Sequence, residues 1–552
     1  MISSMESHCL SFREIPQTTK LFSSFLEDFS AVSRYYAHPP SAEGVLAAAR
    51  QVQLEPAVRR AVVEVLCEQN ARFAPGGALD QAITKNLDRL TSGAVAIVTG
   101  QQVGLFSGPA YSIYKALSAI RVAEETTRRG IEAVPIFWLA TEDHDLAEVN
   151  HTFWNTRNGL ARYDLPETEA DAGHRVGEII LGPAIEEIVA AAAGTLEGSF
   201  AEEVARALRE SYAPGDTYGS AYGKLMARLL AGRGIIYIDP LDTILHRLTA
   251  PVYRRALEVA EPLRDALIAR SKDLDRSGLH AQVKVAGEAT VLFYNVEGRR
   301  QPLRSRDGKF FAGDASFTQA EISAAMESSP LDFTPSVLFR PIIQDSLLPT
   351  AAYIGGPAEV AYMAQAQVVY EKILGRMPAI LPRASFTIVE PQIARFLAKF
   401  DLKFEDVLRG AQHIRSAMEK KMLPPELSQQ FETGEEQLRA LLKSYAAPIE
   451  KLDSTLLGTL ASAEEKMLHQ FSKLKESVGR AQNFRTGIID NKQRILLDAL
   501  YPNHELQERS LCVLPFIAAY GPAFLDDLLR LSSIPGAEES AACAHQHVLL
   551  FL

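Results

Sequence analysis

A polar segment at residues 141–151 concentrates side chains that could move protons or bind a metal. It reads TEDHDLAEVNH, and its ionisable or amide-bearing residues are Glu142, Asp143, His144, Asp145, Glu148, Asn150 and His151. If a helix begins near position 143, then His144, Glu148 and His151 are spaced i, i+4 and i+7 and share one face. That face could bind a divalent metal, or one imidazole could serve as a general base beside the carboxylates. In the alternative, Asp143 caps the helix and the other charges are solvated.

A glycine-rich turn, TGQQVGLFSGP, is the second candidate for a binding site. Its glycines permit positive φ angles and a close backbone approach, and Gln101 and Gln102 each carry a donor and an acceptor. It matches neither GxGxxG nor GxxxxGK[ST], because Lys115 does not directly follow the last glycine. The candidates for substrate or nucleotide contact are Gly100, Gln101, Gln102, Gly104 and Lys115. Lys115 could equally be solvated, and the turn could be an ordinary tight corner.

A third group of candidates lies in LFRPIIQDSLLPTAAYIGGPAEVAYMAQ, residues 338–365. The polar residues within this apolar stretch, and the glycine turn that follows it, are Arg340, Gln344, Asp345, Gly355, Gly356 and Glu359. The turn is typical of a strand that leads into a helix N-terminus. Arg340 could hold a carboxylate or a phosphate bidentately, or it could form a buried structural pair with Asp345. Arg383 is a weaker candidate of the same kind.

Strands that alternate with helices must position these groups. Short apolar runs at residues 94–98, 133–140 and 234–239 predict buried strands, and residues 109–129 have the spacing of an amphipathic helix. This alternation favours a doubly wound parallel sheet, which is an α/β fold. In such sheets ligands bind beyond the carboxyl ends of the strands. We therefore expect the glycine turn and the acidic segment to converge on one pocket.

The pattern along the chain also suggests its domains. Residues 1–386 read as the α/β core, with helices over 43–91 and insertions at about 155–230 and 281–335. Residues 387–500 read as helical, and residues 501–552 as a segment that returns to the core and ends in a possible edge strand, HVLLFL. Within the helical region the apolar residues follow 4,3 spacing, at Met467, Phe471, Leu474, Val478 and Ala481. This seam predicts a coiled coil, either an antiparallel hairpin or a dimer contact.

Composition excludes several classes of partner. The formal net charge of −11 provides no positive field to attract nucleic acid or an anionic membrane. No apolar stretch is long enough to span a bilayer, and the N-terminus lacks the pattern of a signal peptide. The four cysteines, at 9, 67, 512 and 543, form no CxxC pair and are interpreted as reduced thiols of a cytoplasmic protein. No motif indicates a nucleophile.

Four segments together resemble the bacillithiol biosynthesis cysteine-adding family, BshC. They are TGQQVGLFSGPAYSIYK, FWLATEDHDLAEVNH, LFRPIIQDSLLPTAAYIGGPAEVAY and YPNHELQER, and they span about residues 95–509 in the expected order. The resemblance implies a Rossmann-like core with connecting insertions, as in class I aminoacyl-tRNA synthetases, and a helical coiled-coil domain for homodimerisation. It also implies a ligase that joins the cysteine carboxyl group to the amine of glucosaminyl malate.

Amide formation from a carboxylate requires activation, most simply by ATP, with Mg²⁺ as a possible companion. We assign residues 100–108 to substrate or nucleotide contact, and residues 142–145 to proton transfer or metal binding. Arg340 and the Gly355–Gly356 turn would hold malate carboxylates or a phosphate. Two rivals remain: another synthetase-like aminoacyl transfer enzyme, and a non-catalytic scaffold in which the coiled coil is the functional element.

Overall fold

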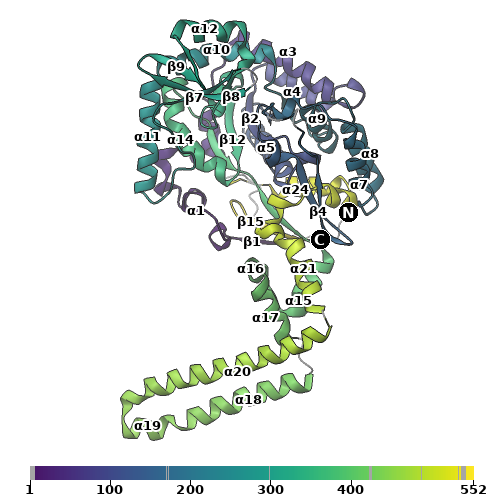
Figure 1. Cartoon of the computed structure of the whole chain (residues 1–552), viewed down its shortest axis with the longest axis vertical. Coiled ribbons are helices and arrows are strands. Elements are labelled where there is room, and N and C mark those ends of the chain that lie inside the picture. Colours follow the sequence, from purple (N-terminus) through teal and green to yellow (C-terminus); the bar gives the residue numbers. More distant parts are fainter. Residues whose placement is uncertain are drawn as a thin grey trace. The chain divides into compact units, whose positions relative to one another are not determined.

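We analysed a computed structural model of the 552-residue chain (Figure 1). It describes residues 6–168, 171, 173–296, 299–421, 425–486, 488–532, 534–535 and 543–552. The chain divides into two compact units. The main parts of the first are Ser7–Thr387 and Glu508–Leu549, and the main part of the second is Ile388–Gln507.

A five-stranded parallel sheet forms the centre of the first unit, in the order β13–β12–β2–β3–β6. The strands are β2 (Val95–Gln102), β3 (Ala133–Ala140), β6 (Ile236–Ile238), β12 (Thr350–Gly355) and β13 (Ala379–Pro382). From β2, the chain adds β3 and β6 on one side of the sheet. It then adds β12 and β13 on the other side of β2. The predicted doubly wound α/β fold is therefore confirmed, and the topological switch point lies between β2 and β12.

The register brings the carboxyl ends of the central strands together. Gly100 at the end of β2 lies opposite Trp138 of β3, and Thr99 lies opposite Ile354 of β12. Helix α5 (Tyr111–Arg128) connects β2 to β3, and helix α14 (Pro357–Ile373) connects β12 to β13. Both helices therefore begin at the switch point, where their N-termini face the same space.

Helices cover the sheet and close its core. Residues 43–91 are helical as predicted, in α2 (Ala42–Ala49), α3 (Pro56–Phe73) and α4 (Gln81–Thr91). One apolar cluster joins α2 and α5 to the sheet, with Val45, Val122, Ile97 and Ile354 all buried. The strands show continuous burial rather than alternation, as expected when both faces of a parallel sheet are covered.

Two groups of inserted elements surround the switch point. Between β3 and β6 come α6 (Leu146–Val149), β4 (His151–Thr156), β5 (Gly159–Asp164), α7 (Ala184–Ala193), α8 (Ala201–Ser211) and α9 (Tyr218–Leu229). Between β6 and β12 come α10 (Thr243–Glu258), α11 (Ala260–Arg276), an antiparallel sheet, α12 (Gln319–Ser328) and α13 (Arg340–Leu347). The antiparallel sheet has the order β10–β9–β8–β7–β11 and includes β7 (Ala289–Val296), β8 (Arg299–Arg306) and β11 (Phe333–Pro335).

The second unit contains a long helical hairpin. Helices α18 (Pro425–Ser444) and α20 (Leu457–Thr486) run side by side and are connected through α19 (Ala446–Leu452), as Figure 1 shows. The rings of Phe431 and Phe471 pack between them with centroids 5.4 Å apart. Of the two alternatives for the coiled-coil seam, the intramolecular hairpin is present within the chain.

The predicted seam does not bury all of its members in this hairpin. Phe471 packs inside, whereas Met467 is 48% exposed and Leu474 is 55% exposed. Leu441, Tyr445, Leu452 and Leu456 add further exposed apolar side chains to the same three-helix stretch. The hairpin therefore carries apolar surface that its own helices do not cover.

The two ends of the chain meet in a separate three-stranded sheet with the order β1–β15–β14. Its strands are β1 (Glu6–Leu10), β14 (Ser385–Val389) and β15 (His547–Phe551). The terminal HVLLFL segment is a strand as expected. The expectation of an edge position is wrong, because β15 lies between the other two strands.

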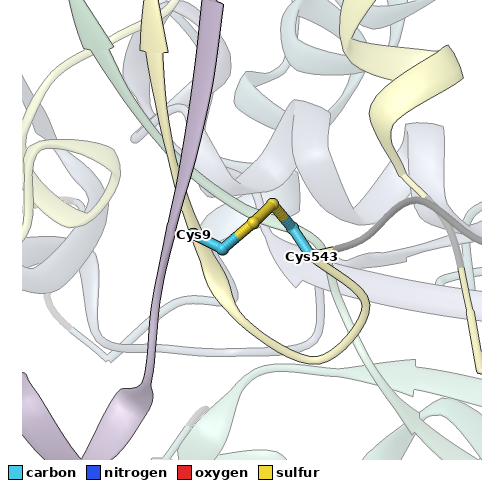
Figure 2. The surroundings of a disulfide bond; sticks show 2 residues. All are labelled: Cys9 and Cys543. Atoms are coloured by element: carbon cyan, nitrogen blue, oxygen red, sulfur yellow. A yellow bond between two sulfur atoms is a disulfide. The ribbon is translucent and has the colours of Figure 1, made fainter.

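The expectation of four reduced cysteines is also wrong. Cys9 of β1 and Cys543, just before β15, form a disulfide with a Cα–Cα distance of 5.3 Å (Figure 2). Sequence spacing could not reveal the pair, because the two residues are 534 positions apart and meet only when β1 and β15 associate. Cys67 and Cys512 are free, and burial raises the pKa of the Cys512 thiol to about 11. Within the described residues no helix is both long and apolar enough to cross a bilayer.

Candidate functional site

A cavity of about 650 Å³ opens at the carboxyl edge of the parallel sheet. The glycine turn contributes Gly100, Gln101 and Gln102 to its wall, and the acidic segment contributes Glu142 and Asp143. The third group contributes Arg340, Gly356 and Glu359, and α5 contributes Lys115. The structure thus brings the three predicted groups to one cavity at the topological switch point.

The glycine turn and the acidic segment are bonded directly to each other. The side-chain amide of Gln102 donates to Asp143 Oδ2 at 2.6 Å and to Glu148 Oε2 at 2.9 Å. A single glutamine therefore fixes two carboxylates of the neighbouring strand end. Glu148 holds this position without lining the cavity itself.

Lys115 lines the cavity but is almost fully buried, with 3% of its surface exposed. Its ammonium group donates to the carbonyl oxygen of Gly100 and to Gln101 Oε1, each at 2.8 Å, and forms an ion pair with Glu359. The alternative of a solvated lysine is wrong. Burial lowers the pKa of Lys115, although Glu359 counteracts part of this effect.

Glu359 stands at the N-terminus of α14 and joins both sides of the switch point. It accepts from Gly356 N at 2.7 Å and from the Tyr353 hydroxyl at 2.5 Å. Burial raises the pKa of Glu359, but Lys115 and these two donors outweigh it and hold the pKa below its usual range. The carboxylate is therefore ionised and fully engaged.

Arg340 is the second cation of the cavity and is half-buried. Its guanidinium donates to Gln344 Oε1 at 3.2 Å and to the hydroxyls of Tyr353 and Tyr362 at 3.1 and 3.3 Å. None of these partners carries a negative charge at neutral pH, and Arg340 forms no ion pair within the described part of the chain. Of these charged side chains, Lys115 and Arg340 are cations and Glu359 is the anion, which leaves this part of the cavity lining with a net positive charge.

The alternative of an Arg340–Asp345 pair is wrong. Asp345 instead accepts from Gln344 Nε2 at 2.9 Å and from the Tyr370 hydroxyl at 2.5 Å. Burial raises the pKa of its carboxyl group. Gln344 therefore lies behind Arg340 and links it to Asp345, and neither Gln344 nor Asp345 lines the main cavity.

Two carboxylates, those of Glu142 and Asp143, also line the cavity, together with the guanidinium of Arg300. Glu142 Oε1 lies 3.2 Å from His246 Nε2, and His246 Nδ1 lies 3.1 Å from the carbonyl oxygen of Pro330. Because that carbonyl only accepts, the contact with Pro330 is a hydrogen bond in which Nδ1 donates. Sequence reasoning missed His246, since it sits in α10 more than a hundred positions after Glu142 with no motif around it.

The predicted helical face for a metal is wrong. Helix α6 spans only Leu146–Val149, so His144 precedes it and His151 already belongs to strand β4. Within the described ranges no group of three or more His, Cys, Asp or Glu residues is placed to hold a metal ion. The burial of β4 alternates, with Thr152 and Trp154 inside. This period of two was the signal for a strand.

The remaining candidates of the acidic segment lie outside the main cavity. His144 lines an adjoining cavity of about 310 Å³, where its Nδ1 is 3.4 Å from Arg300 Nη1. Asp145 caps α6 by accepting from Glu148 N, and Asn150 donates to the carbonyl oxygen of Leu165. Of the four catalytic candidates, Glu142 and Asp143 therefore reach the cavity.

Two of the predicted glycines have packing roles. A Cβ atom on Gly104 would lie 2.8 Å from the Cα atom of Gly108, so the turn can close only with glycine there. A Cβ atom on Gly355 would lie 3.0 Å from the Cβ atom of Glu359. Both residues shape the turns that present the cavity-lining groups, without lining the cavity themselves.

Arg383 and Arg509 add positive charge to the same wall. Arg383 follows β13, was only a weak candidate from the sequence, and forms a buried ion pair with Glu508 at 2.7 Å. The elements between β6 and β12 supply a mostly apolar part of the cavity lining, which includes Leu267, Val283, Val291, Leu292 and Phe293. Arg300 stacks on the Phe293 ring at 3.5 Å and borders both cavities.

Comparison with known proteins gives consistent matches along the chain. Residues 5–384 match the family model "Bacillithiol biosynthesis BshC, N-terminal Rossmann-like domain", and residues 386–538 match "Bacillithiol biosynthesis BshC, C-terminal coiled-coil domain". Three relatives carry the name "Putative cysteine ligase BshC". The Koribacter versatilis relative is 38% identical over 94% of this chain and 97% of its own length. Those of Solibacter usitatus and Salinibacter ruber are 35% and 31% identical, over 96% and 92% of this chain and 98% and 93% of their own lengths.

Proposed function

Because this chain belongs to the bacillithiol biosynthesis BshC family, we propose that it is a cysteine ligase. It joins the carboxyl group of L-cysteine to the amine of glucosaminyl malate through an amide bond, and the product is bacillithiol. The names of the relatives support the ligase class, and the chemistry of the cavity supports the substrates.

One observation carries this proposal, the presence of both signs of charge on the lining of one cavity. Lys115, Arg340 and Arg300 supply positive charge, and Glu142 and Asp143 supply negative charge. Glucosaminyl malate carries two carboxylates and an ammonium group, and cysteine carries one of each. A cavity lined by both cations and carboxylates suits substrates of this kind, because each substrate charge then gains a counter-ion.

ATP activates the cysteine carboxylate in this proposal. The carboxylate oxygen attacks a phosphorus atom of ATP, and either ADP or pyrophosphate leaves as the acyl phosphate or acyl adenylate forms. The amine of glucosaminyl malate then attacks the acyl carbon, and phosphate or AMP departs. Lys115 and Arg340 stabilise the negative charge on these groups, and the Gln101 side chain donates to them.

A carboxylate of the cavity lining supplies the proton acceptor. The amine arrives as an ammonium ion and must lose a proton before it can attack. Glu142 and Asp143 are the carboxylates available for this step, and Asp143 is fixed by Gln102.

Turnover by the purified protein tests the proposal. Incubation with cysteine, glucosaminyl malate and ATP is expected to yield bacillithiol, together with either ADP and phosphate or AMP and pyrophosphate. Arg340→Gln should lower kcat/KM by about a hundredfold or more, because a cation of the cavity lining is lost. Arg206→Gln, at an exposed position of α8, is the matched control and should leave turnover unchanged. Absence of product with wild-type protein would refute the ligase assignment.

A deletion strain gives an independent answer. Loss of the gene should abolish bacillithiol and cause glucosaminyl malate to accumulate. Unchanged thiols, together with no shift in melting temperature on adding the three substrates, would favour the scaffold alternative. Tight binding of tRNA in a filter assay would favour a synthetase-like enzyme, which the formal net charge of −11 argues against.

We propose further that the protein is a homodimer that acts in the cytoplasm, without nucleic-acid or membrane partners. The apolar side chains left exposed on the hairpin, among them Leu441, Leu452 and Leu474, support a second copy as the covering surface. A Leu441→Glu, Leu474→Glu double variant should elute as a monomer in size-exclusion chromatography with light scattering. A wild-type protein that is already monomeric at micromolar concentration would contradict the dimer.

A further inference from the structure

Arg383 is anchored on one side and open on the other. Its Nη1 donates to the carbonyl oxygen of Ala384 at 2.9 Å, and its Nη2 donates to Glu508 Oε1 at 2.7 Å. Its Nε forms none of the described hydrogen bonds and lies 3.6 Å from where a Cβ on Gly356 would stand, at the cavity wall. The guanidinium therefore keeps donors for a ligand in the cavity.

Glu508 fixes the anchored side of Arg383. Its carboxylate is 1% exposed and accepts from three donors, which are Arg383 Nη2, Ser385 Oγ at 2.8 Å and Phe386 N at 2.9 Å. Burial raises the pKa of Glu508, but Arg383 and Ser385 outweigh it and hold the pKa below its usual range. A buried carboxylate with this many donors holds its orientation rigidly.

The network continues to the C-terminal strand with a defined order of protons. Ser385 gives its hydroxyl proton to Glu508, so its oxygen accepts from His547 Nδ1, 2.7 Å away. His547 Nε2 then accepts from the Thr387 hydroxyl at 2.9 Å, which makes the imidazole neutral. Every hydrogen-bonding atom of the imidazole is used, and His547 is fully buried.

We propose that Glu508, Ser385 and His547 are positioning residues that aim Arg383 at a carboxylate of the malate part of the acceptor substrate. This assigns a role to the YPNHELQER segment, which contains Glu508, and to strand β15, which contains His547. This inference rests on the proposed ligase function. It adds that recognition of the acceptor depends on a network outside the cavity.

Substrate-specific kinetics test this role. Glu508→Gln keeps the shape of the side chain but puts an amide N–H group against the Phe386 N–H or the Arg383 guanidinium, so the network cannot close. The KM for glucosaminyl malate should rise about tenfold, with kcat and the KM for cysteine within about threefold of wild type. Ser385→Ala, which spares the ion pair, should show a smaller rise of about threefold in the same KM. Glu186→Gln, exposed on α7, is the matched control and should show none.

A neutral acceptor separates positioning from a general loss of structure. Methyl glucosaminide has the same amine without the malate carboxylates, so Glu508→Gln and wild type should use it with equal kcat/KM. An equal loss with both acceptors, or an unchanged KM for glucosaminyl malate, would overturn the proposal. Calorimetric binding of L-malate gives a readout without turnover. If wild type binds L-malate and Glu508→Gln binds it more weakly, the positioning role stands even where the ligase reaction fails.

Discussion

Lys115 and Glu359 show how single residues tie the cavity to the fold. Lys115 lies in α5, the helix after β2, and Glu359 lies in α14, the helix after β12. Their ion pair connects these two helices at the switch point. The sequence placed both residues among the candidates because each follows a glycine turn. It could not show that Lys115 is buried, because the burial comes from packing against β12 and α14.

Removing the charge of Lys115 alone should lower the free energy of unfolding far more than removing the charges of both Lys115 and Glu359. Lys115→Met leaves the half-buried Glu359 carboxylate without its cation, and we expect a loss of about 3 kcal/mol in the free energy of unfolding. The Lys115→Met, Glu359→Gln double variant should recover part of that loss. Urea unfolding at pH 7 measures both, with Lys309→Met at an exposed position as the control. A double variant less stable than the single one would contradict the pairing.

His547 predicts a dependence of stability on pH. Burial lowers the pKa of His547 to about 4, below the ordinary value of 6.5. The unfolded chain therefore binds a proton before the folded one does, and stability is lost as the pH falls from 6.5 towards 4. The full effect of this one residue is about 3 kcal/mol. The difference in urea midpoint between wild type and His547→Gln should change between pH 7 and pH 5. A constant difference would refute the assignment.

At the scale of elements, local sequence patterns predicted the strands and turns of the parallel sheet. Pairings between distant residues determined the elements that these patterns did not predict. The apolar runs of β2 and β3 are continuous, and polar residues follow each run. The position of these polar residues at the carboxyl edge of the sheet could therefore be inferred from the sequence. The acidic segment was predicted as a helix because its charged residues recur at helical spacing. Strand β4 pairs with β5 instead and buries Thr152 and Trp154, and this pairing outweighs the weak helical preference. The roles of Glu508 and His246 could not be predicted, because only the folded chain brings them into contact with Arg383 and Glu142.

The glycine turn after β2 is the element most sensitive to a single methyl group. Phe106, Ser107 and Gly108 all have positive φ angles, and Gly104 packs against Gly108. Gly104→Ala should force this turn apart and lower the free energy of unfolding by about 1–3 kcal/mol, with a loss of activity. Gly182→Ala, where a Cβ meets no atom within 4 Å, is the matched control in a thermal melt. Equal melting temperatures for the two variants would contradict this account.

At the scale of the whole molecule, the disulfide joins the first strand to the last. It fixes β15, whose His547 belongs to the network behind Arg383. Cys9→Ser should lower stability by about 2–4 kcal/mol under oxidising conditions, because the unfolded chain regains its freedom. Dithiothreitol should destabilise wild type to the same level and leave the variant unchanged. Cys67→Ser, which removes a free thiol, serves as the control, and a wild-type melt insensitive to dithiothreitol would contradict the prediction.

This cross-link also turns most of the polypeptide into a covalent ring. Residues 388–507, the main part of the second unit, lie within that ring because they stand between Cys9 and Cys543 in the sequence. A protease that cuts once within residues 388–507 would therefore yield two pieces that still migrate as one band on a non-reducing gel. They would separate only after a reductant opens the cysteine pair at the termini.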